Sequence, residues 1–172
     1  MEKKDFIDLL KNRVSVRSFL DKEVSDEDIN FIMDAGKMAP TGMNRQPLLF
    51  IALKNKDIRK KYADLIKEFT ERPTDAYYDS PVVILFFSQD SPTKVLDGAA
   101  ALENMLLATA AIDLGACWIH RSSFFFASEK GKQFQKEIGI GEEYECLESI
   151  ALGYIKGDKP QFKERVEGSK II

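Results

Sequence analysis

The sequence has little of what metal sites, redox pairs and membrane spans require. Its 172 residues include two cysteines, one histidine and one tryptophan. Cys117 and Cys146 lie far apart, with no C-x-x-C motif and no histidine at ligand spacing, so we interpret both as buried apolar thiols and expect no metal. The longest apolar runs, 81–87 and 99–111, are too short or too interrupted by polar residues to span a bilayer. We therefore expect no membrane segment and a cytoplasmic protein.

The net charge of the chain argues against binding to nucleic acid. The formal net charge is -3, and no basic stripe of the kind that nucleic-acid binding needs is present, so no nucleic acid partner is expected. With 44% hydrophobic and 31% charged residues, the composition is ordinary for a globular protein that buries a sizeable core. The length predicts a single domain over residues 1–172.

The segment 11–19 places two arginines and a serine at two-residue spacing. In an extended segment Arg13, Ser15 and Arg17 would point to one side, while the valines between them would be buried behind. Arginine suits a phosphate site because its planar fork can hold two oxygens, and a hydroxyl adds a shorter donor. This spacing predicts an anion-binding cradle. The alternative is an amphipathic edge strand whose arginines are solvated.

Hydrophobic periodicity predicts helices that alternate with strands. The helix signals include a capping box that begins at Ser25 and an aspartate cap at Asp97, and Pro40 and Pro47 mark a loop. On this pattern an α+β sandwich and a doubly wound sheet fit equally well. The expected helices are 5–11, 25–38, 56–71, 97–114 and 128–138, and the expected strands are 48–53, 82–87, 116–121 and 148–155.

The expected helix 97–114 is apolar nearly all round and rich in alanine. Such a helix must be covered on every side, and its alanines permit close approach of another backbone. It therefore belongs either to the centre of the monomer core or to a dimer interface. By contrast, the lysines of the expected helix 56–71 are interpreted as a solvated face.

Four segments, in order, resemble the flavin-dependent nitroreductase family over nearly the whole chain. They are Arg13-x-Ser15-x-Arg17, the loop Ala39–Pro47, the stretch from Asp97-Gly98-Ala99 to Trp118-Ile119, and Ala151-Leu152-Gly153-Tyr154 before a basic tail. The resemblance implies an α+β, three-layer sandwich with a mixed, mainly antiparallel sheet flanked by helices. It also implies a homodimer with one FMN in each active site, shared between the two subunits.

Roles for single residues follow from the same resemblance. Arg13 and Ser15 are similar to contacts of the FMN phosphate and ribityl chain, and Arg17 to a partner of the phosphate or of the N1/O2 edge. The loop residues would reach the ring from the other subunit, and the backbone of 118–120 would face it near N5. The implied cofactor-binding residues are Arg13, Val14, Ser15, Arg17, Pro40, Thr41, Gly42, Asn44, Gln46, Trp118, Ile119, His120 and, as a C-terminal phosphate clamp, Lys163 and Arg165.

Two aromatic features of the sequence, the single histidine and a run of three phenylalanines, each allow two roles. We interpret the single histidine, His120, as a loop or core residue held through its backbone, with proton donation as the alternative. The run Phe124–Phe126, expected on a loop, is typical of core or dimer contacts, but Phe124 is also a candidate substrate contact through stacking.

The sequence also departs from the family pattern in two places. Longer members carry Asn-x-x-Lys before the second core strand, where this chain has Arg72-Pro73-Thr74-Asp75. The connection from Phe87 to Asp97 is short, which leaves the pocket either open or covered by the phenylalanine run.

The function implied by the resemblance is an FMN-dependent oxidoreductase. It would transfer hydride from NADH or NADPH, through flavin N5, to a nitroaromatic, a quinone or a similar small electrophile in a ping-pong cycle. Because the flavin carries the chemistry, no catalytic side chain is assigned. The alternatives are an enone reductase or reductive dehalogenase, a flavin-binding or sensing module without turnover, and a domain without a cofactor.

Overall fold

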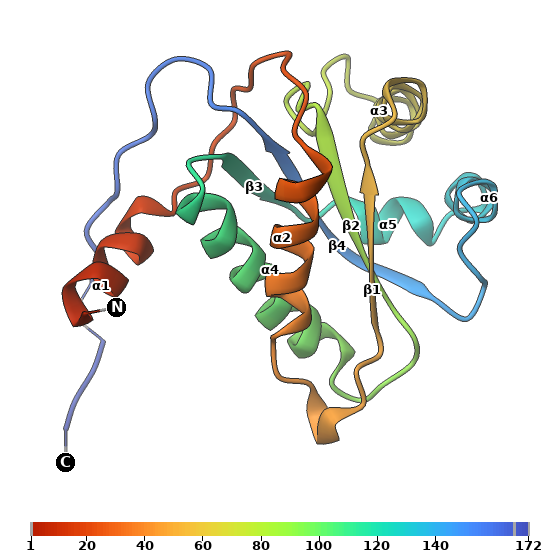
Figure 1. Cartoon of the computed structure of the whole chain (residues 1–172). Helices are drawn as coiled ribbons and strands as arrows, with labels where there is room; N and C mark the ends of the chain where they lie inside the picture. Colours follow the sequence, from red (N-terminus) through yellow and green to blue (C-terminus); the bar gives the residue numbers. More distant parts are fainter. Residues whose placement is uncertain (1, 167, 172) are drawn as a thin grey trace.

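The central layer of the protein is a four-stranded sheet in the order β1-β2-β4-β3. The strands are β1 (Leu48–Leu53), β2 (Val82–Ser88), β3 (Gly115–Ile119) and β4 (Glu145–Gly153) in a computed structural model that describes residues 2–166 and 168–171 (Figure 1). Each neighbouring pair is antiparallel. The continuous apolar sequence of β2 explains its central place, because every residue of this strand is buried.

Helices cover both faces of the sheet (Figure 1). α2 (Asp26–Lys37) and α4 (Lys94–Ala111) lie on one face, and α1 (Lys3–Asn12) lies beside α4. α3 (Lys56–Thr70), α5 (Ser122–Phe126) and α6 (Glu129–Glu137) lie on the other. Each face has its own hydrophobic core, one centred on α2 and α4 and one rich in aromatic rings from α3, α5 and α6. The expected three-layer α+β sandwich is confirmed. Its sheet is antiparallel, and parallel pairing among the described residues is limited to the single bridge between Ser15 and Ala116.

Several element boundaries differ from those expected. α4 begins at Lys94 with Thr93 as its N-cap residue, so Asp97 is not the cap and lies one turn inside the helix. β4 begins at Glu145 rather than at Glu148. The phenylalanine run is a short helix, α5, and not a loop. Two of its rings, Phe125 and Phe126, belong to the hydrophobic core, in agreement with the interpretation of this run as core contacts.

The two cysteines are free and buried, in agreement with the interpretation as apolar thiols. Burial raises the pKa of both thiols, more strongly at Cys146. Within residues 2–166 and 168–171, no helix has the length and apolar character needed to cross a membrane.

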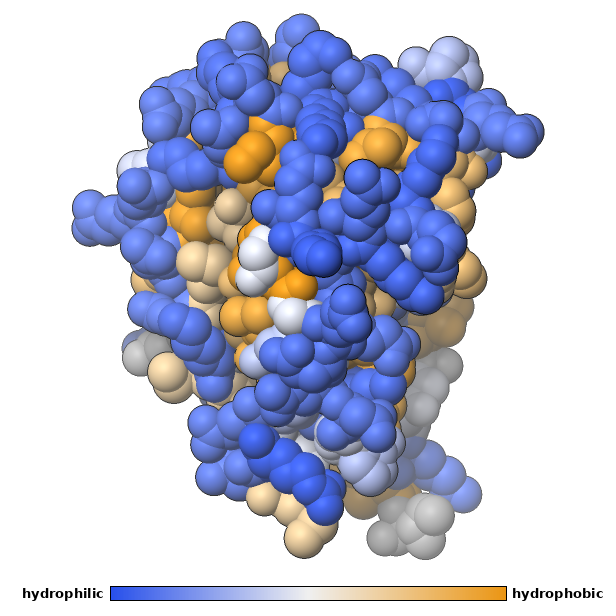
Figure 2. All heavy atoms as spheres, turned by 90° about the vertical axis from the view of Figure 1, so that its right-hand side faces the viewer, coloured by the Kyte–Doolittle hydropathy of each residue, from blue (hydrophilic) through white to orange (hydrophobic). Residues whose placement is uncertain are grey.

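The outer surface over α3 and α6 is largely hydrophilic (Figure 2). Lysines of α3 form surface ion pairs there, such as Lys60 with Asp64 and Lys61 with Glu137. This agrees with a solvated lysine face. Large exposed apolar side chains occur on elements of both faces, for example Ile58 and Phe69 on α3 and Leu96 on α4.

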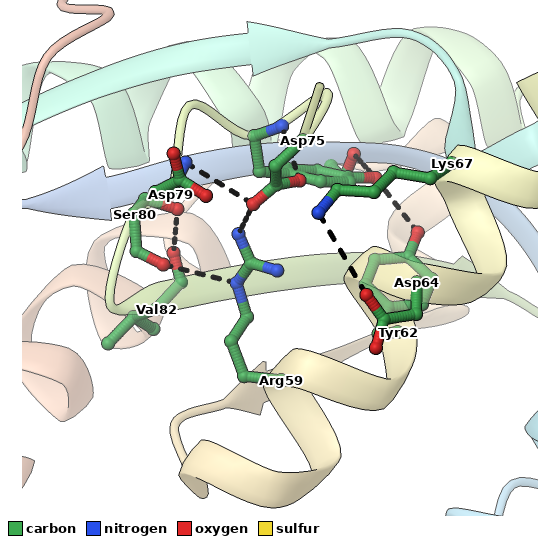
Figure 3. A network of polar contacts seen from close by, with 10 residues as sticks. Arg59, Tyr62, Asp64, Lys67, Asp75, Asp79, Ser80 and Val82 are labelled. Atoms are coloured by element: carbon green, nitrogen blue, oxygen red, sulfur yellow. Dashed lines mark hydrogen bonds and ion pairs between the residues drawn. The ribbon is translucent and has the colours of Figure 1, made fainter. Parts of the chain in front are cut away.

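One ion pair is buried beneath α3 (Figure 3). The Arg59 guanidinium donates to Asp75 at 2.5 Å and to the Ser80 carbonyl at 3.1 Å. Both side chains of the pair are nearly inaccessible, at 8% and 2% exposure. Asp75 also accepts from the backbone N–H groups of Tyr77 and Asp79. The stretch Arg72–Asp75, which departs from the family pattern, therefore ends in Asp75, and this residue attaches the connection that precedes β2 to the helix α3.

Removing one partner of this pair should destabilise the fold. In Asp75→Ala the Arg59 charge would stay buried without its carboxylate, and we expect a loss of about 3–5 kcal/mol in the free energy of unfolding, measured by urea denaturation. Asp64→Ala, which removes an exposed partner of Lys60 on the same helix, is the matched control and should cost far less. Equal losses for the two variants would contradict the assignment.

Candidate functional site

The segment after α1 pairs with the outer edge of β3, which is the edge strand of the sheet. Ser15 forms a bridge with Ala116, and the Val16 N–H donates to the Ala116 carbonyl at 2.9 Å. Val16 is buried in the core, as its position between the polar residues predicts. Ser15 and Arg17 both lie near Cys117, where they oppose the rise in the pKa of that thiol caused by burial. The structure thus brings Ser15 and Arg17 together on one side of the segment.

Arg13 lies against α4. Its Nε atom is 3.6 Å from a carboxylate oxygen of Glu103. The neighbouring Asn12 amide donates to the Ala110 carbonyl at 3.3 Å, and Lys159 donates to Asn12 Oδ1 at 2.6 Å. Lys159 therefore joins this group of cations, although sequence reasoning did not single it out. The only signal was its place in the basic tail.

The C-terminal tail runs beside α1 (Figure 1). The Phe162 ring lies between two cations, with the Arg165 guanidinium 5.2 Å and Lys11 Nζ 6.0 Å from its centroid. Such cation–π contacts attach a segment without regular secondary structure to the helix. Lys163 is exposed to solvent on the same tail. Positive charge from both ends of the chain therefore gathers around the end of α1.

The loop 40–46 has a strained backbone. Met43, Asn44 and Gln46 all adopt positive φ angles, which are uncommon for residues other than glycine. Hydrogen bonds within the loop hold this shape, from the Gln46 N–H to Thr41 Oγ1 at 3.1 Å and from Gln46 Nε2 to Asn44 Oδ1 at 3.0 Å. Backbone strain of this kind is concentrated at functional sites.

The first turn of α4 anchors this loop. Asp97, which is buried, accepts from the Gly42 N–H at 3.1 Å and from the Thr93 hydroxyl at 3.0 Å. A Cβ at Gly42 would lie 2.2 Å from Thr93 Oγ1, so only glycine fits this approach. Asp97 thus joins the loop to the N-terminal end of α4, which begins three residues before Asp97.

The cradle and the loop contact α4 at different points along its length. Arg13 lies against Glu103 in the middle of the helix and its neighbour Asn12 against Ala110 in the last turn, whereas the loop contacts Asp97 in the first turn (Figure 1). A helix of 18 residues is about 27 Å long. Within one chain, Ala110 follows Asp97 by 13 residues, so the contacts of Asn12 and of the loop are about 20 Å apart along this helix.

A third group lies at the end of β3. Trp118 is 43% exposed, and its indole N–H donates to Glu148 at 2.7 Å. His120 Nδ1 lies 2.5 Å from the other oxygen of the same carboxylate. The Ile119 carbonyl accepts from the Ser149 hydroxyl at 2.7 Å, so this backbone is firmly held. Sequence reasoning missed Glu148, although an acid within an otherwise apolar strand was a usable signal.

Phe124 lies next to this group. Its side chain is 60% exposed, and its ring meets that of His120 edge to face at a centroid distance of 5.4 Å. Unlike the next two phenylalanines, it is free of the core, so it is available for contact with another molecule.

Comparisons with known proteins bear on the family and the fold. Residues 10–154 match the model of the nitroreductase family. Proteins named "Putative NADH dehydrogenase/NAD(P)H nitroreductase" from Archaeoglobus fulgidus and Methanothermobacter thermautotrophicus are each 28% identical to the chain. The first match covers 88% of this chain and 86% of the relative, and the second covers 90% and 79%.

Among solved structures, a nitroreductase with bound FMN from Bacteroides fragilis superposes with a TM-score of 0.88. It is 23% identical, and the match covers 100% of this chain and 98% of that one, which shows a shared fold. Because the family model spans most of the sequence, from the cradle to the end of the last strand, the chain belongs to the nitroreductase family.

Proposed function

We propose that the protein is an FMN-dependent oxidoreductase that takes hydride from NADH or NADPH and reduces a nitroaromatic, a quinone or a similar small electrophile. The whole chain, 1–172, would form one FMN-binding domain. The observation that carries the proposal is the group of cations and the serine hydroxyl gathered along the edge of β3, in a chain of this family. When bound, FMN would supply the hydride transfer, and the protein would supply binding and orientation.

The residues of the cradle fit a doubly charged phosphate. Among the residues described, Arg13 is paired only through Nε, at 3.6 Å, which leaves both terminal nitrogens of its fork for an anion. Ser15 adds a hydroxyl, and Val14 adds a backbone N–H. Lys159 lies close by through Asn12. We assign these residues to the phosphate and ribityl chain, with Lys163 and Arg165 as further tail cations.

Arg17 is assigned a second role. It is exposed, and its Nη1 donates to the Ser15 carbonyl at 3.5 Å. We propose that it binds the phosphate or the N1/O2 edge of the flavin ring, where a fixed positive charge would stabilise added negative charge. The backbone of Trp118, Ile119 and His120 would contact the ring near N5, and Phe124 would contact the substrate.

The proposed site needs a second copy of the chain. Because the loop with Pro40, Thr41, Gly42, Asn44 and Gln46 lies at the far end of α4 from the cradle, it would contact the cofactor held by a partner subunit. Exposed apolar side chains support a homodimer, since a stable interface needs apolar area to bury. Those near the loop and on α1 are Phe6, Ile7, Met38, Met43, Val95 and Leu96.

The visible spectrum of the purified protein tests the function. We expect flavin absorbance, in the protein as purified or after incubation with FMN, and its bleaching by NADH or NADPH without oxygen. The bleached protein should regain its colour when a quinone or a nitroaromatic is added. A protein that binds FMN but is bleached by neither nicotinamide would be a flavin-binding module, and one that takes up no FMN would contradict the proposal entirely.

Arg17→Ala should weaken FMN binding by about 10- to 100-fold, because a hydrogen bond from a charged donor contributes about 1.5–3 kcal/mol. The dissociation constant can be measured from the quenching of flavin fluorescence. Lys132→Ala removes an equal charge from α6, on the other face of the sheet, and should leave FMN affinity unchanged. An Arg17→Ala protein with wild-type affinity and a wild-type rate of bleaching would remove this role.

Mixing two inactive variants tests the shared site. The cradle variant Arg13→Ala/Arg17→Ala and the loop variant Asn44→Ala/Gln46→Ala damage opposite halves. If each site combines the halves of two subunits, equal mixing and exchange should leave about one quarter of all sites intact and restore NAD(P)H oxidation to that level. A mixture of single variants Arg13→Ala and Arg17→Ala, both in the cradle, should not gain activity beyond its average. No gain for the first mixture would contradict the shared site.

A further inference from the structure

The carboxylate of Glu148 is buried at the edge of the proposed site. Its side chain is only 8% exposed, and no lysine or arginine pairs with it within residues 2–166 and 168–171. Instead it accepts hydrogen bonds from two rings, Trp118 Nε1 at 2.7 Å and His120 Nδ1 at 2.5 Å. A buried carboxylate is costly unless hydrogen bonds satisfy it, so this residue contributes more than packing. Its clearest effect is to fix the positions of both rings.

The contact also fixes which nitrogen of His120 is free. A carboxylate only accepts hydrogen bonds, so Nδ1 carries the hydrogen that it donates to Glu148, and Nε2 is the remaining reactive atom. The imidazole is 66% exposed, so Nε2 can exchange protons with water. The edge-to-face contact with Phe124 restrains the ring from the other side.

The imidazole of His120 lies away from the cradle, on the side where the flavin ring and the substrate would bind on the proposed function. Ser15 pairs with Ala116, and His120 follows four residues further along the extended chain, a distance of about 13 Å. Trp118, on the same strand, lies between the two. The imidazole is therefore at the end of β3 that is remote from the proposed phosphate contacts.

We propose that His120 donates a proton to the substrate as it is reduced, and that Glu148 is the positioning residue that presents Nε2 for this transfer. The proposal rests on the proposed function. The donor is the protonated ring, which carries hydrogen on both nitrogens. The electrophile receives a hydride, and the oxygen that gains the electron pair takes the proton from Nε2, which leaves a neutral ring with its hydrogen on Nδ1 facing Glu148. Nε2 then takes a new proton from the solvent. The Glu148 contact holds the His120 side chain in addition to the backbone that the sequence interpretation considered.

The role of Glu148 can be read from the histidine itself, because the chain contains one histidine. In protein with 15N-labelled histidine, NMR shifts of the neutral ring should show the hydrogen on Nδ1. In Glu148→Gln the amide can accept from Trp118 and donate to Nδ1, so the hydrogen should move to Nε2. Glu145→Gln, an exposed position on the same strand, is the control and should keep the wild-type tautomer. An unchanged tautomer in Glu148→Gln would overturn the positioning role.

The proton transfer is tested by comparing two oxidants. Protein reduced by NADH or NADPH is mixed with a quinone, which needs protons, or with ferricyanide, which accepts only electrons. His120→Gln should lower the ratio of the quinone rate to the ferricyanide rate by about 10- to 100-fold, within the usual contribution of a general acid. Glu148→Gln should lower the same ratio.

The outcomes separate the two proposals. A wild-type ratio in His120→Gln would overturn the proton donor role alone. A wild-type protein that neither nicotinamide reduces would overturn the proposed function and this role with it. His120 is largely exposed, so His120→Gln is expected to fold normally, and its thermal unfolding temperature checks this.

Discussion

The close packing of α4 against α2 and against the sheet is the constraint on which the rest of the structure depends. Small residues permit it at two points, because a Cβ at Gly36 would meet Met105 at 2.3 Å and a Cβ at Gly98 would meet Leu147 at 2.9 Å. The helix is therefore held by α2 on one side and by β4 on another. Since Asn12, next to Arg13, contacts Ala110 in the last turn of α4 and Gly42 contacts Asp97 in the first, this helix also sets the distance between the two halves of the proposed site.

A polar network on the opposite face holds the end of β3 from behind. The hydroxyls of Tyr62, Tyr77, Ser122 and Ser149 are linked by hydrogen bonds, and Ser149 donates to the Ile119 carbonyl. Burial raises the pKa of both tyrosines, so the phenols remain neutral donors. Every buried polar side-chain atom among the described residues has a partner. The exposed rings of the site therefore rest on a rigid base.

Features of the fold and of the candidate site that depend on neighbouring residues could be predicted from the sequence, whereas those that depend on residues far apart in the chain could not. The apolar run of β2 and the Ser25 cap of α2 are local signals, and both elements lie where the pattern predicts. The contact between Trp118 and Glu148 joins β3 and β4, and it depends on the register of these two strands. No local pattern encodes that register. Lys159 was missed for the same reason, because only the folded tail brings it to Asn12.

The meeting of Lys159 with Asn12 has a consequence for how the protein acquires its cofactor during synthesis. The cradle is built from residues at the beginning of the chain and completed by residues close to its end, and β3 must already have paired with β4. A nascent chain in which Lys159 has not yet left the ribosome would thus present an incomplete anion site. On the proposed function, tight FMN uptake would follow the docking of Lys159 on Asn12, and chains that lack this contact would not capture free flavin.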